Sequence, residues 1–347
     1  MVLGGIAAAG FKLAKTPGDS RMDFSRKRVL LGDIGATNAR FAFLSKGVLG
    51  PVSNFTVADF PHFTDAVGAF LDGDYRSGTG DEAVLAIAGP VSAGRCILTN
   101  CSWTIDQHEV CRAFGFAKVR LCNDFEAVAR SLPHLTTTDL FRVGDGEPLP
   151  GAPMAVLGPG TGLGVACLVP ASDGPAVIGG EGGHATMAAT SPREDAIIDY
   201  LRRQFGHVSA ERVVSGSGLE NLYHAIVALD GVDAPKRSAP EITRAGLDGT
   251  CPLSRAALEL FCGMLGTIAG NVGLMFGARG GVYIAGGIAP RITDFIAHSE
   301  FRARFEGKGR LRTYLQSIST GIIIHPAATF IGLRTLVDCG RAGTKRP

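Results

Sequence analysis

Two short segments of the chain combine glycine with hydroxyl or carboxylate side chains directly after an apolar run. Residues 33–38 read DIGATN, and residues 158–162 read GPGTG. Glycine lets the backbone approach a bound anion closely, and backbone N–H groups and a threonine hydroxyl can donate to phosphate oxygens. Asp33 can hold Mg²⁺ directly or through water. Either segment taken alone also fits the turn of an ordinary hairpin.

The second segment differs from two common nucleotide-binding loops. No Gly-Lys-Ser/Thr sequence follows it, so it is not a Walker loop, and a strand pattern rather than a helix follows, so it is not a Rossmann fingerprint. Phosphate binding would therefore depend on backbone N–H groups, the Thr161 hydroxyl and Mg²⁺, without help from a loop lysine.

Two polar residues, Asn123 and Asp124, end the apolar stretch KVRLC. A carboxylate at the end of a strand is well placed to act as a general base. The same aspartate could instead cap the helix that is predicted to follow it, and both roles are compatible.

Further candidates lie in the second half of the chain. Glu181 and His184 are three residues apart in the glycine frame GGEGGH, so both can point at one small polar ligand, and no second histidine or cysteine nearby completes a metal site. Glu211 lies in a helical pattern, which taken alone favours a solvated surface acid. Gly286 and Gly287 end the apolar run GGVYIA, where a flat adenine could lie against the backbone or a buried strand could simply turn.

These motifs are attached to predicted strands and helices that occur in a weakly repeated order. A strand, a glycine turn and a second strand are predicted at residues 29–44 and again at 154–169, each followed by mixed strands and helices. Two similar α/β halves of this kind would face each other across a cleft, and ligands in such folds bind at the loop ends of the strands.

The remaining elements are predicted from apolar periodicity, with Asp106 as the N-cap of one helix. Further strands are expected at 52–57, 83–89, 118–124, 280–288 and 321–326, with short extended pieces around 96–103. Helices are expected at 60–71, 106–114, 125–132, 192–205, 218–229, 241–247, 253–276 and 327–337.

Length and composition limit the class of protein. A chain of 347 residues suggests two domains, and 46% hydrophobic with 19% charged residues indicates a globular protein. The net charge of +2 without a basic stripe argues against nucleic acid as a partner. Eight cysteines without a Cys-x-x-Cys pair fit the reduced thiols of a cytoplasmic protein, and no uninterrupted apolar run reaches the roughly 18 residues of a membrane helix. Residues 1–27 are expected to form a flexible extension.

Taken together and in order, the motifs resemble the bacterial glucokinase family, within the sugar kinases of the actin/hexokinase ATPase superfamily. The matching stretches run from about Val29 to the final helix and are LGDIGATNARFAF, LTNCSW, LCNDFEAVA, GPGTGLGVA, GGEGGH, GHVSAERVVSGSGLENLY and GGVYIAGGIAPR. The resemblance implies an α/β, two-domain actin-like ATPase (ribonuclease H-like) fold. A cleft would separate a small domain of residues 28–134 plus 325–347 from a large domain of residues 135–324.

The resemblance also implies roles for individual residues. Asp124 matches the catalytic base, and Asp33 would hold Mg²⁺, most simply through water. The sugar-binding set matches Asn100, Asn123, Asp124, Glu181, His184 and Glu211. The ATP-binding and phosphate-binding set matches Asp33, Gly35, Ala36, Thr37, Asn38, Gly160, Thr161, Gly162, Gly286 and Gly287.

The function implied is the transfer of a phosphoryl group from ATP, with Mg²⁺, to the 6-hydroxyl of glucose, giving glucose 6-phosphate and ADP at the first step of glycolysis. The protein would then be a cytoplasmic homodimer with glucose and ATP as its partners, and with no nucleic acid or membrane partner. The alternatives are a kinase for another hexose or amino sugar, a non-catalytic sugar sensor of the same fold, and an actin-like filament protein.

The sequence departs from the family's usual pattern at Ala36, and it lacks a zinc motif that a related group of sugar kinases carries. Ala36 stands where the family usually has glycine, so the first turn must have ordinary backbone angles at that residue. The related repressor/kinase group carries a cysteine-rich zinc motif after its Glu-x-Gly-His, whereas ATMAATSPRED follows His184 here and contains no cysteine. This argues against that group and against a structural zinc ion.

Overall fold

The structure is a computed structural model that describes residues 28–74, 81–98 and 101–337. Contacts between residues divide the chain into two compact units. The first unit holds the described residues up to His134 and those from Ala327 onward, and the second holds Leu135–Pro326.

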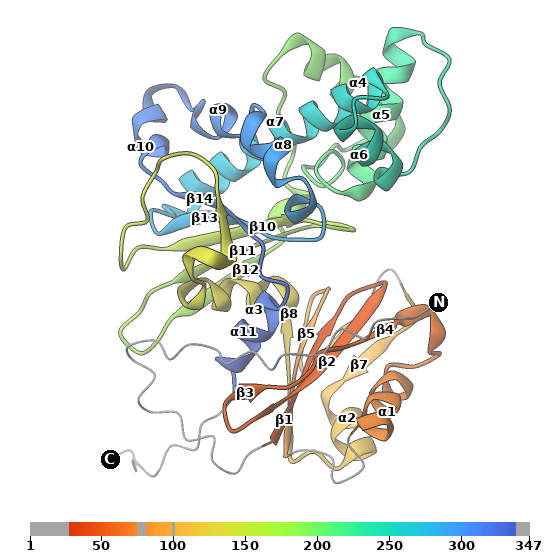
Figure 1. Ribbon diagram of the computed structural model, residues 1–347, viewed down its shortest axis with the longest axis vertical. Helices are drawn as coiled ribbons and strands as arrows, with labels where there is room; N and C mark the ends of the chain where they lie inside the picture. The colour runs from red at the N-terminus through yellow and green to blue at the C-terminus, as the bar shows by residue number, and fades with distance from the viewer. Residues whose placement is uncertain (1–27, 75–80, 99–100, 338–347) are drawn as a thin grey trace, which may run out of the picture. The chain divides into compact units, whose positions relative to one another are not determined.

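The first unit is built on a mixed sheet with the strand order β3-β2-β1-β5-β8, and β4 also pairs with β2 (Figure 1). Its strands are β1 (Arg28–Ile34), β2 (Asn38–Ser45), β3 (Val48–Leu49), β4 (Ser53–Thr56), β5 (Glu82–Ile87) and β8 (Lys118–Asn123). Strands β1, β5 and β8 are parallel, whereas β2 runs antiparallel to β1. The carboxyl ends of the three parallel strands therefore meet at one edge of the sheet, where the candidate aspartates lie.

Helices cover this sheet, and the unit also contains a small separate ribbon of two strands. The helices are α1 (Phe63–Asp74), α2 (Gln107–Phe114), α3 (Asp124–Ser131) and α11 (Ala328–Arg334), and the ribbon strands are β6 (Arg95–Ile97) and β7 (Thr104–Asp106). Helices α3 and α11 pack so closely that a side chain at Gly332 would meet the backbone oxygen of Ala127 at 1.7 Å. The last helix of the chain therefore belongs to the first unit and supports α3.

The second unit contains a six-stranded sheet of order β12-β11-β10-β13-β14-β9. Its strands are β9 (Leu140–Arg142), β10 (Met154–Pro159), β11 (Leu163–Val169), β12 (Ala176–Gly180), β13 (Gly281–Ile284) and β14 (Thr320–Ile323). Strands β10, β13 and β14 are parallel, and β11 is antiparallel to β10. The order β12-β11-β10-β13-β14 and its strand directions repeat those of β3-β2-β1-β5-β8, so the predicted internal repeat is confirmed.

Seven helices are described in the second unit. They are α4 (Pro192–Phe205), α5 (Gly216–Asp230), α6 (Ala239–Leu247), α7 (Pro252–Phe276), α8 (Thr293–His298), α9 (Phe301–Glu306) and α10 (Arg312–Gln316). Short 3₁₀ helices in the two units are η1 (Val57–Asp59), η2 (Leu132–His134), η3 (Thr137–Asp139), η4 (Gly182–His184), η5 (Ala289–Arg291) and η6 (Gly309–Leu311).

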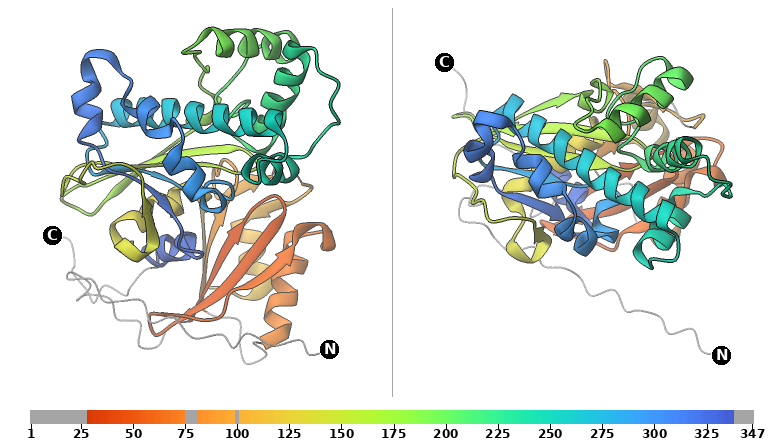
Figure 2. Two further views of the ribbon diagram at one scale, coloured as in Figure 1. Left: turned by 45° about the horizontal axis from the view of Figure 1, so that its top comes forward. Right: turned by 90° about the horizontal axis from the view of Figure 1, so that it is seen from above.

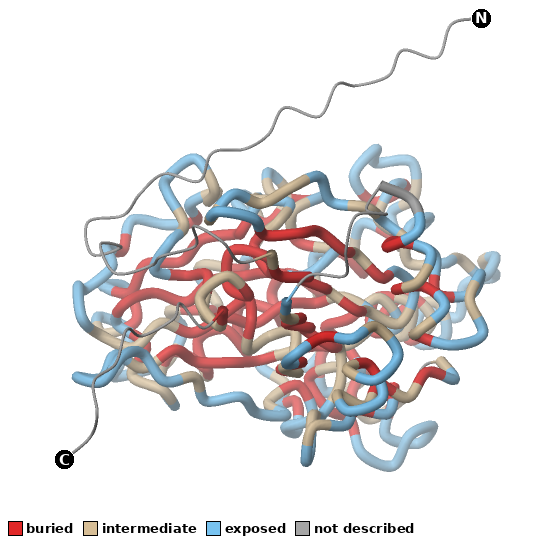
Figure 3. Tube along the Cα trace, turned by 90° about the horizontal axis from the view of Figure 1, so that it is seen from below, coloured by how far each residue is buried: buried red, intermediate tan, exposed pale blue. Residues whose placement is uncertain are grey.

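Helix α7 is the centre of the second unit's core. It lies across one face of the sheet (Figure 2) and packs against helices α5, α6 and α9. By length and composition it is the one described helix that could span a membrane, but 72% of its apolar window is buried inside the protein. Small residues allow the close packing, since a side chain at Gly266 would meet the backbone oxygen of Phe301 at 2.1 Å. Figure 3 shows the buried stretches running through the interior, with exposed residues along the outer loops.

Most of the predicted elements are present with small changes at their ends. The helix at Pro192–Phe205 is confirmed at both ends, and Asp106 caps α2 by accepting from the backbone N–H groups of His108 and Glu109. The helix expected from residue 60 begins instead at Phe63, because Pro61 favours extended backbone just before it. The short strands β9 and β12 and the helices α8 to α10 were not predicted, since their patterns are too short to stand out.

Candidate functional site

In the first unit, the hairpin between β1 and β2 places a charged pair at the predicted phosphate motif. The strand register sets Asp33 directly opposite Arg40, and the Arg40 Nε donates to Asp33 Oδ2 at 3.0 Å, with Nη2 in contact with the same oxygen. The turn closes with a hydrogen bond of 2.9 Å from the Gly35 N–H to the Asn38 carbonyl. The arginine was missed in the sequence, although counting across the hairpin would have placed it opposite the aspartate.

Ala36 fits this turn without strain. Among the described non-glycine residues, positive φ angles occur at Lys46 and Ala93, so Ala36 has the ordinary backbone angles that alanine requires. Ala36 also lines a pocket of about 420 Å³ together with Phe60 and Trp103. The alanine in place of the usual glycine therefore leaves the hairpin intact.

The carboxyl end of β8 places Asn123 and Asp124 near that turn on the same edge of the sheet, because Ile34, Ile87 and Asn123 occupy matching positions of β1, β5 and β8. The alternative reading of Asp124 as the helix cap is wrong. Asn123 is the N-cap of α3, and its Oδ1 accepts from the N–H groups of Phe125 at 2.9 Å and Glu126 at 3.3 Å.

Asp124 is the first residue of α3, and its Oδ1 accepts from the Phe125 N–H at 2.9 Å. A carboxylate in the first turn of a helix is stabilised by the positive end of the helix dipole. Asp124 is half-buried, so its carboxylate is held in a defined place while it stays accessible to a ligand. Asn100, the remaining sugar candidate of this unit, lies outside the described residues.

In the second unit, the hairpin between β10 and β11 forms the second glycine turn. Pro159 pairs with Leu163, and the Gly160 N–H donates to the Gly162 carbonyl at 2.8 Å. A side chain at Gly160 would meet nothing within 4 Å, so open space lies beside the turn. The predicted turn at residues 160–162 is confirmed as a structural element.

Gly286 lies directly against this hairpin. It has a φ of +86°, and a side chain there would meet the carbonyl oxygen of Pro159 at 2.3 Å. Ile288 donates its N–H to the same carbonyl at 3.3 Å. Two features of the fold therefore require glycine at position 286, and they place the Gly286–Gly287 segment beside the second turn.

The sugar candidates of the second unit lie on adjoining turns. Glu181 precedes η4 and His184 is its last residue; both side chains are exposed, and Glu181 Oε2 is 3.9 Å from His184 Nε2. The backbone N–H of Glu211 donates to the carbonyl of Gly183 at 2.9 Å, which fixes Glu211 next to this pair. The structure therefore brings Glu181, His184 and Glu211 together.

The helical pattern predicted around Glu211 is wrong, because residues 211–213 form a turn before α5. Backbone bonds from Ala210 to Ala185 and from Glu211 to Gly183 hold the segment against η4 and prevent a helix from continuing there. Glu211 is half-buried, and its Oε2 accepts from the backbone N–H of Leu163 at 2.9 Å. This contact with the glycine hairpin was not predicted.

A magnesium ion fits the residues at Asp33 only in combination with other ligands. Arg40 occupies one oxygen of the carboxylate, and the other oxygen has no hydrogen-bond partner among the described residues. The described part of the chain contains no group of three or more His, Cys, Asp or Glu residues that could hold a metal. Mg²⁺ is commonly bound through one or two carboxylates plus phosphates and water, so a lone carboxylate is a suitable partner for nucleotide-bound Mg²⁺.

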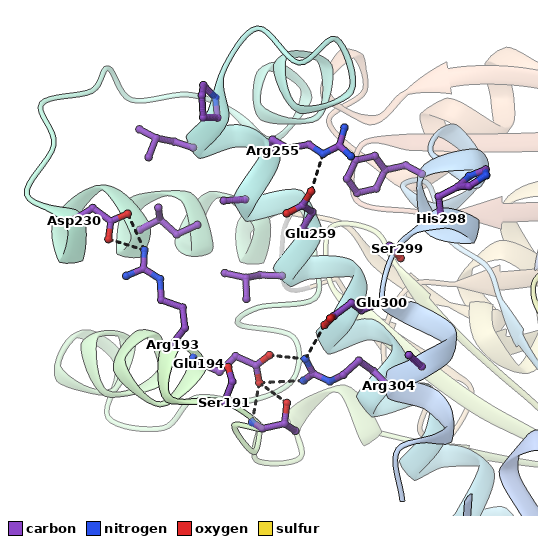
Figure 4. A pocket seen from close by; sticks show the side chains of 18 residues that line it. Ser191, Arg193, Glu194, Asp230, Arg255, Glu259, His298, Ser299, Glu300 and Arg304 are labelled. Atoms are coloured by element: carbon purple, nitrogen blue, oxygen red, sulfur yellow. Dashed lines mark hydrogen bonds and ion pairs between the residues drawn. The ribbon is translucent and has the colours of Figure 1, made fainter. Parts of the chain in front are cut away.

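A separate pocket of about 960 Å³ lies among α4, α5, α7, α8 and α9 of the second unit (Figure 4). Its charged side chains are paired with one another: Arg193 with Asp230 and Arg255 with Glu259, both at 2.8 Å, and Arg304 with Glu194. None of the predicted site residues lines it. Each arginine that lines the pocket therefore has an acidic partner within it, so none of these arginines is left unpaired for a ligand.

Two α/β units of one strand order, each with a glycine hairpin at the carboxyl edge of its parallel strands, define the class of two-domain actin-like ATPases with a ribonuclease H-like fold. The glucokinase family model matches residues 30–339, and the chain belongs to the glucokinase family.

Individual relatives agree with this assignment. The glucokinase of Paramagnetospirillum magneticum is 47% identical over 314 residues, which cover 89% of this chain and 97% of that protein. The glucokinase of Chromobacterium violaceum is 44% identical, covering 85% of this chain and 84% of that protein. The crystal structure of a glucokinase from an Antarctic psychrotroph has a TM-score of 0.79 and 34% identity, covering 90% of this chain and 99% of that one.

Proposed function

We propose that the protein transfers the γ-phosphoryl group of ATP to the 6-hydroxyl of glucose, giving glucose 6-phosphate and ADP. The observation that carries this proposal is the placement of Asp124. Its carboxylate is fixed in the first turn of α3, at the same sheet edge as the Asp33 hairpin. Membership of the glucokinase family supports the identity of the reaction.

In this proposal, Asp124 accepts the proton of the 6-hydroxyl as the hydroxyl oxygen attacks the phosphorus. General bases of this kind typically accelerate a reaction by about 10²–10⁴. The backbone N–H of Phe125 holds the carboxylate in place at the start of α3. Asn123 keeps the helix start in place.

Glucose would be bound through carboxylate, amide and imidazole groups that accept or donate to its hydroxyls. The proposed set is Asn100, Asn123, Asp124, Glu181, His184 and Glu211. Each carboxylate can accept from two hydroxyl groups, so a sugar that lacks one hydroxyl would leave a polar group unpaired. Sites built in this way can discriminate by about 10⁴ or more.

The ATP phosphates would be bound by the two hairpin turns, and the adenosine part by the segment of Gly286 and Gly287. When bound, Mg²⁺ would neutralise phosphate charge, with Asp33 holding it directly or through water. Arg40 keeps the Asp33 carboxylate in one orientation. The division into a small and a large domain, the cytoplasmic location and the homodimer remain predictions from the family resemblance.

A coupled assay of ADP release tests the proposal, with ATP, Mg²⁺ and a panel of glucose, mannose, fructose, glucosamine and N-acetylglucosamine. We expect strong turnover with glucose. Preference for another sugar would keep the Asp124 mechanism and change the substrate. A folded protein that binds sugar but turns over none of the panel would favour a sugar sensor.

A further inference from the structure

We infer that Glu211 is a positioning residue for the phosphate-binding turn at residues 160–162, in addition to its proposed contact with sugar. This inference rests on the proposed function. Its basis is that one oxygen of the Glu211 carboxylate is bonded to the hairpin itself, at the Leu163 N–H that directly follows the turn.

The close approach of this carboxylate is built into the sequence of the hairpin. A side chain at Gly162 would lie 2.5 Å from Glu211 Oε2, a distance that carbon and oxygen do not adopt without a bond. Glycine at position 162 therefore makes room for the carboxylate as well as for a phosphate. The glycine at position 162 is thus explained by a protein contact between residues 48 apart in the sequence.

The hydrogen bonds of the turn show which backbone N–H groups of residues 160–163 are available to a ligand. The Gly160 N–H is bonded to the Gly162 carbonyl, and the Leu163 N–H is bonded to Glu211. Within the described residues, the N–H groups of Thr161 and Gly162 have no acceptor. These two groups and the Thr161 hydroxyl remain to bind phosphate oxygens, and Glu211 fixes the end of the turn that presents them.

The backbone of Glu211 connects the same turn to the sugar candidates. Its N–H is bonded to Gly183, between Glu181 and His184, and its carbonyl accepts from Ser215 Oγ at 2.8 Å. The next residue, Gly216, donates its N–H to the carbonyl of Gly160 at 2.9 Å. The segment from Glu211 to Gly216 therefore contacts the sugar loop at its first residue and the phosphate turn at both ends.

The negative charge of Glu211 would by itself have the opposite effect on nucleotide binding, so the two influences can be separated by experiment. Among the described residues Glu211 has no ion-pair partner, so its negative charge close to a phosphate turn would repel nucleotide. If charge were its main influence, removing the carboxylate would tighten nucleotide binding. If positioning is its main influence, removing it loosens the turn and weakens nucleotide binding.

The test compares three variants by the Kd of the Mg²⁺ complex of AMPPNP, measured by calorimetry without sugar and with saturating glucose. Glu211→Gln keeps the length of the side chain and an oxygen that accepts from Leu163, so we expect nucleotide affinity within about twofold of wild type. Glu211→Asp keeps the charge but shortens the reach, and Glu211→Ala removes the acceptor. Both should weaken AMPPNP binding by about tenfold, the usual effect of losing one hydrogen bond to a charged group.

Glu181→Gln is the matched control, because the Glu181 side chain is 73% exposed, its ion-pair partner among the described residues is His184 at 3.9 Å, and the hairpin N–H of Leu163 is bonded to Glu211 instead. This variant should weaken glucose binding and leave AMPPNP affinity unchanged. Wild-type or tighter AMPPNP binding by a folded Glu211→Asp variant would overturn the inference. If wild-type protein binds no AMPPNP under either condition, the proposed function itself fails.

Discussion

Asn123 and Asp124 are adjacent in sequence and have different tasks in the structure. The Asn123 Oδ1 accepts two backbone N–H groups of α3, and its Nδ2 donates to the Gly89 carbonyl at 3.2 Å. One N–H of the amide is left for a sugar hydroxyl. Asp124 Oδ1 accepts from the backbone N–H of Phe125, which fixes the carboxylate that we propose as the general base.

We expect Asp124→Asn to lower kcat by about 10²–10⁴, because the amide cannot accept the hydroxyl proton. Binding of AMPPNP should be little changed, which calorimetry can check alongside the ADP-release assay. Asn123→Ala is the control for damage to the helix start, since it should cost about 1 kcal/mol of stability through the lost cap. Near-normal kcat in the Asp124 variant would exclude it as the base.

At the scale of elements, a buried ion pair ties α4 to α9. Glu194 is 1% exposed, and its two carboxylate oxygens accept from Arg304 at 2.8 and 3.0 Å and from the N–H and hydroxyl of Thr190. Burial by itself raises the pKa of Glu194, but the bonds from Arg304 and Thr190 outweigh it and hold the pKa below its usual value. The ionised carboxylate is therefore part of the folded state.

Glu194→Ala should lower the free energy of unfolding by about 3–5 kcal/mol at pH 7, because it leaves the largely buried Arg304 guanidinium with only a longer ion pair of 3.8 Å to the exposed Glu300. Since the folded pKa of Glu194 is lowered, its contribution is complete above the unfolded pKa of about 4.3 and is lost as pH falls through the folded pKa. Urea unfolding of wild type and variant at neutral and acidic pH measures the effect, since the difference in their free energies of unfolding should shrink as the pH falls.

The matched control lies on the same helix. Asp199 is 49% exposed and pairs with Arg203 at 2.6 Å, so Asp199→Asn should change stability by less than about 1 kcal/mol. Equal effects of the two substitutions would mean that burial of the Glu194 pair is not what stabilises the contact between the helices.

At the scale of the whole molecule, each unit has its own buried core, and each contributes proposed ligand-binding residues. One cluster surrounds α7 in the second unit, and two clusters lie on the two faces of the first sheet. Asp33 and Asp124 belong to the first unit, and Glu181, His184 and Glu211 belong to the second. A ligand that binds the folded protein and not the unfolded chain stabilises it against unfolding.

D-glucose at about 100 times its Kd should stabilise the native protein by about 2.7 kcal/mol, while L-glucose should have no effect. Scanning calorimetry gives the stabilisation, and hydrogen exchange locates it. Slower exchange is expected both in residues 118–131 and in residues 179–186. A segment that gains no protection would contradict the proposed sugar contacts of that segment.

Much of the fold follows from local sequence patterns. The helix from Pro192 to Phe205 is set between Ser191, which caps its start, and Gly206, which ends it. The two hairpins were predicted because a glycine turn separates apolar strands in each. The roles that the family resemblance implies for the site residues stay predictions, and Asn100 lies outside the described part of the structure.

Side-chain contacts between distant segments were decided only by the tertiary structure. The register of β1 on β2 sets Arg40 against Asp33, and the folding of the segment after α4 against η4 brings Glu211 to the hairpin. Periodicity reports which face of an element is buried, but it contains no information on which distant backbone group a carboxylate will meet. The sequence therefore determined the elements and the chemical groups available, and the tertiary structure determined that Arg40 lies against Asp33 and that Glu211 accepts from the Leu163 N–H of the second hairpin.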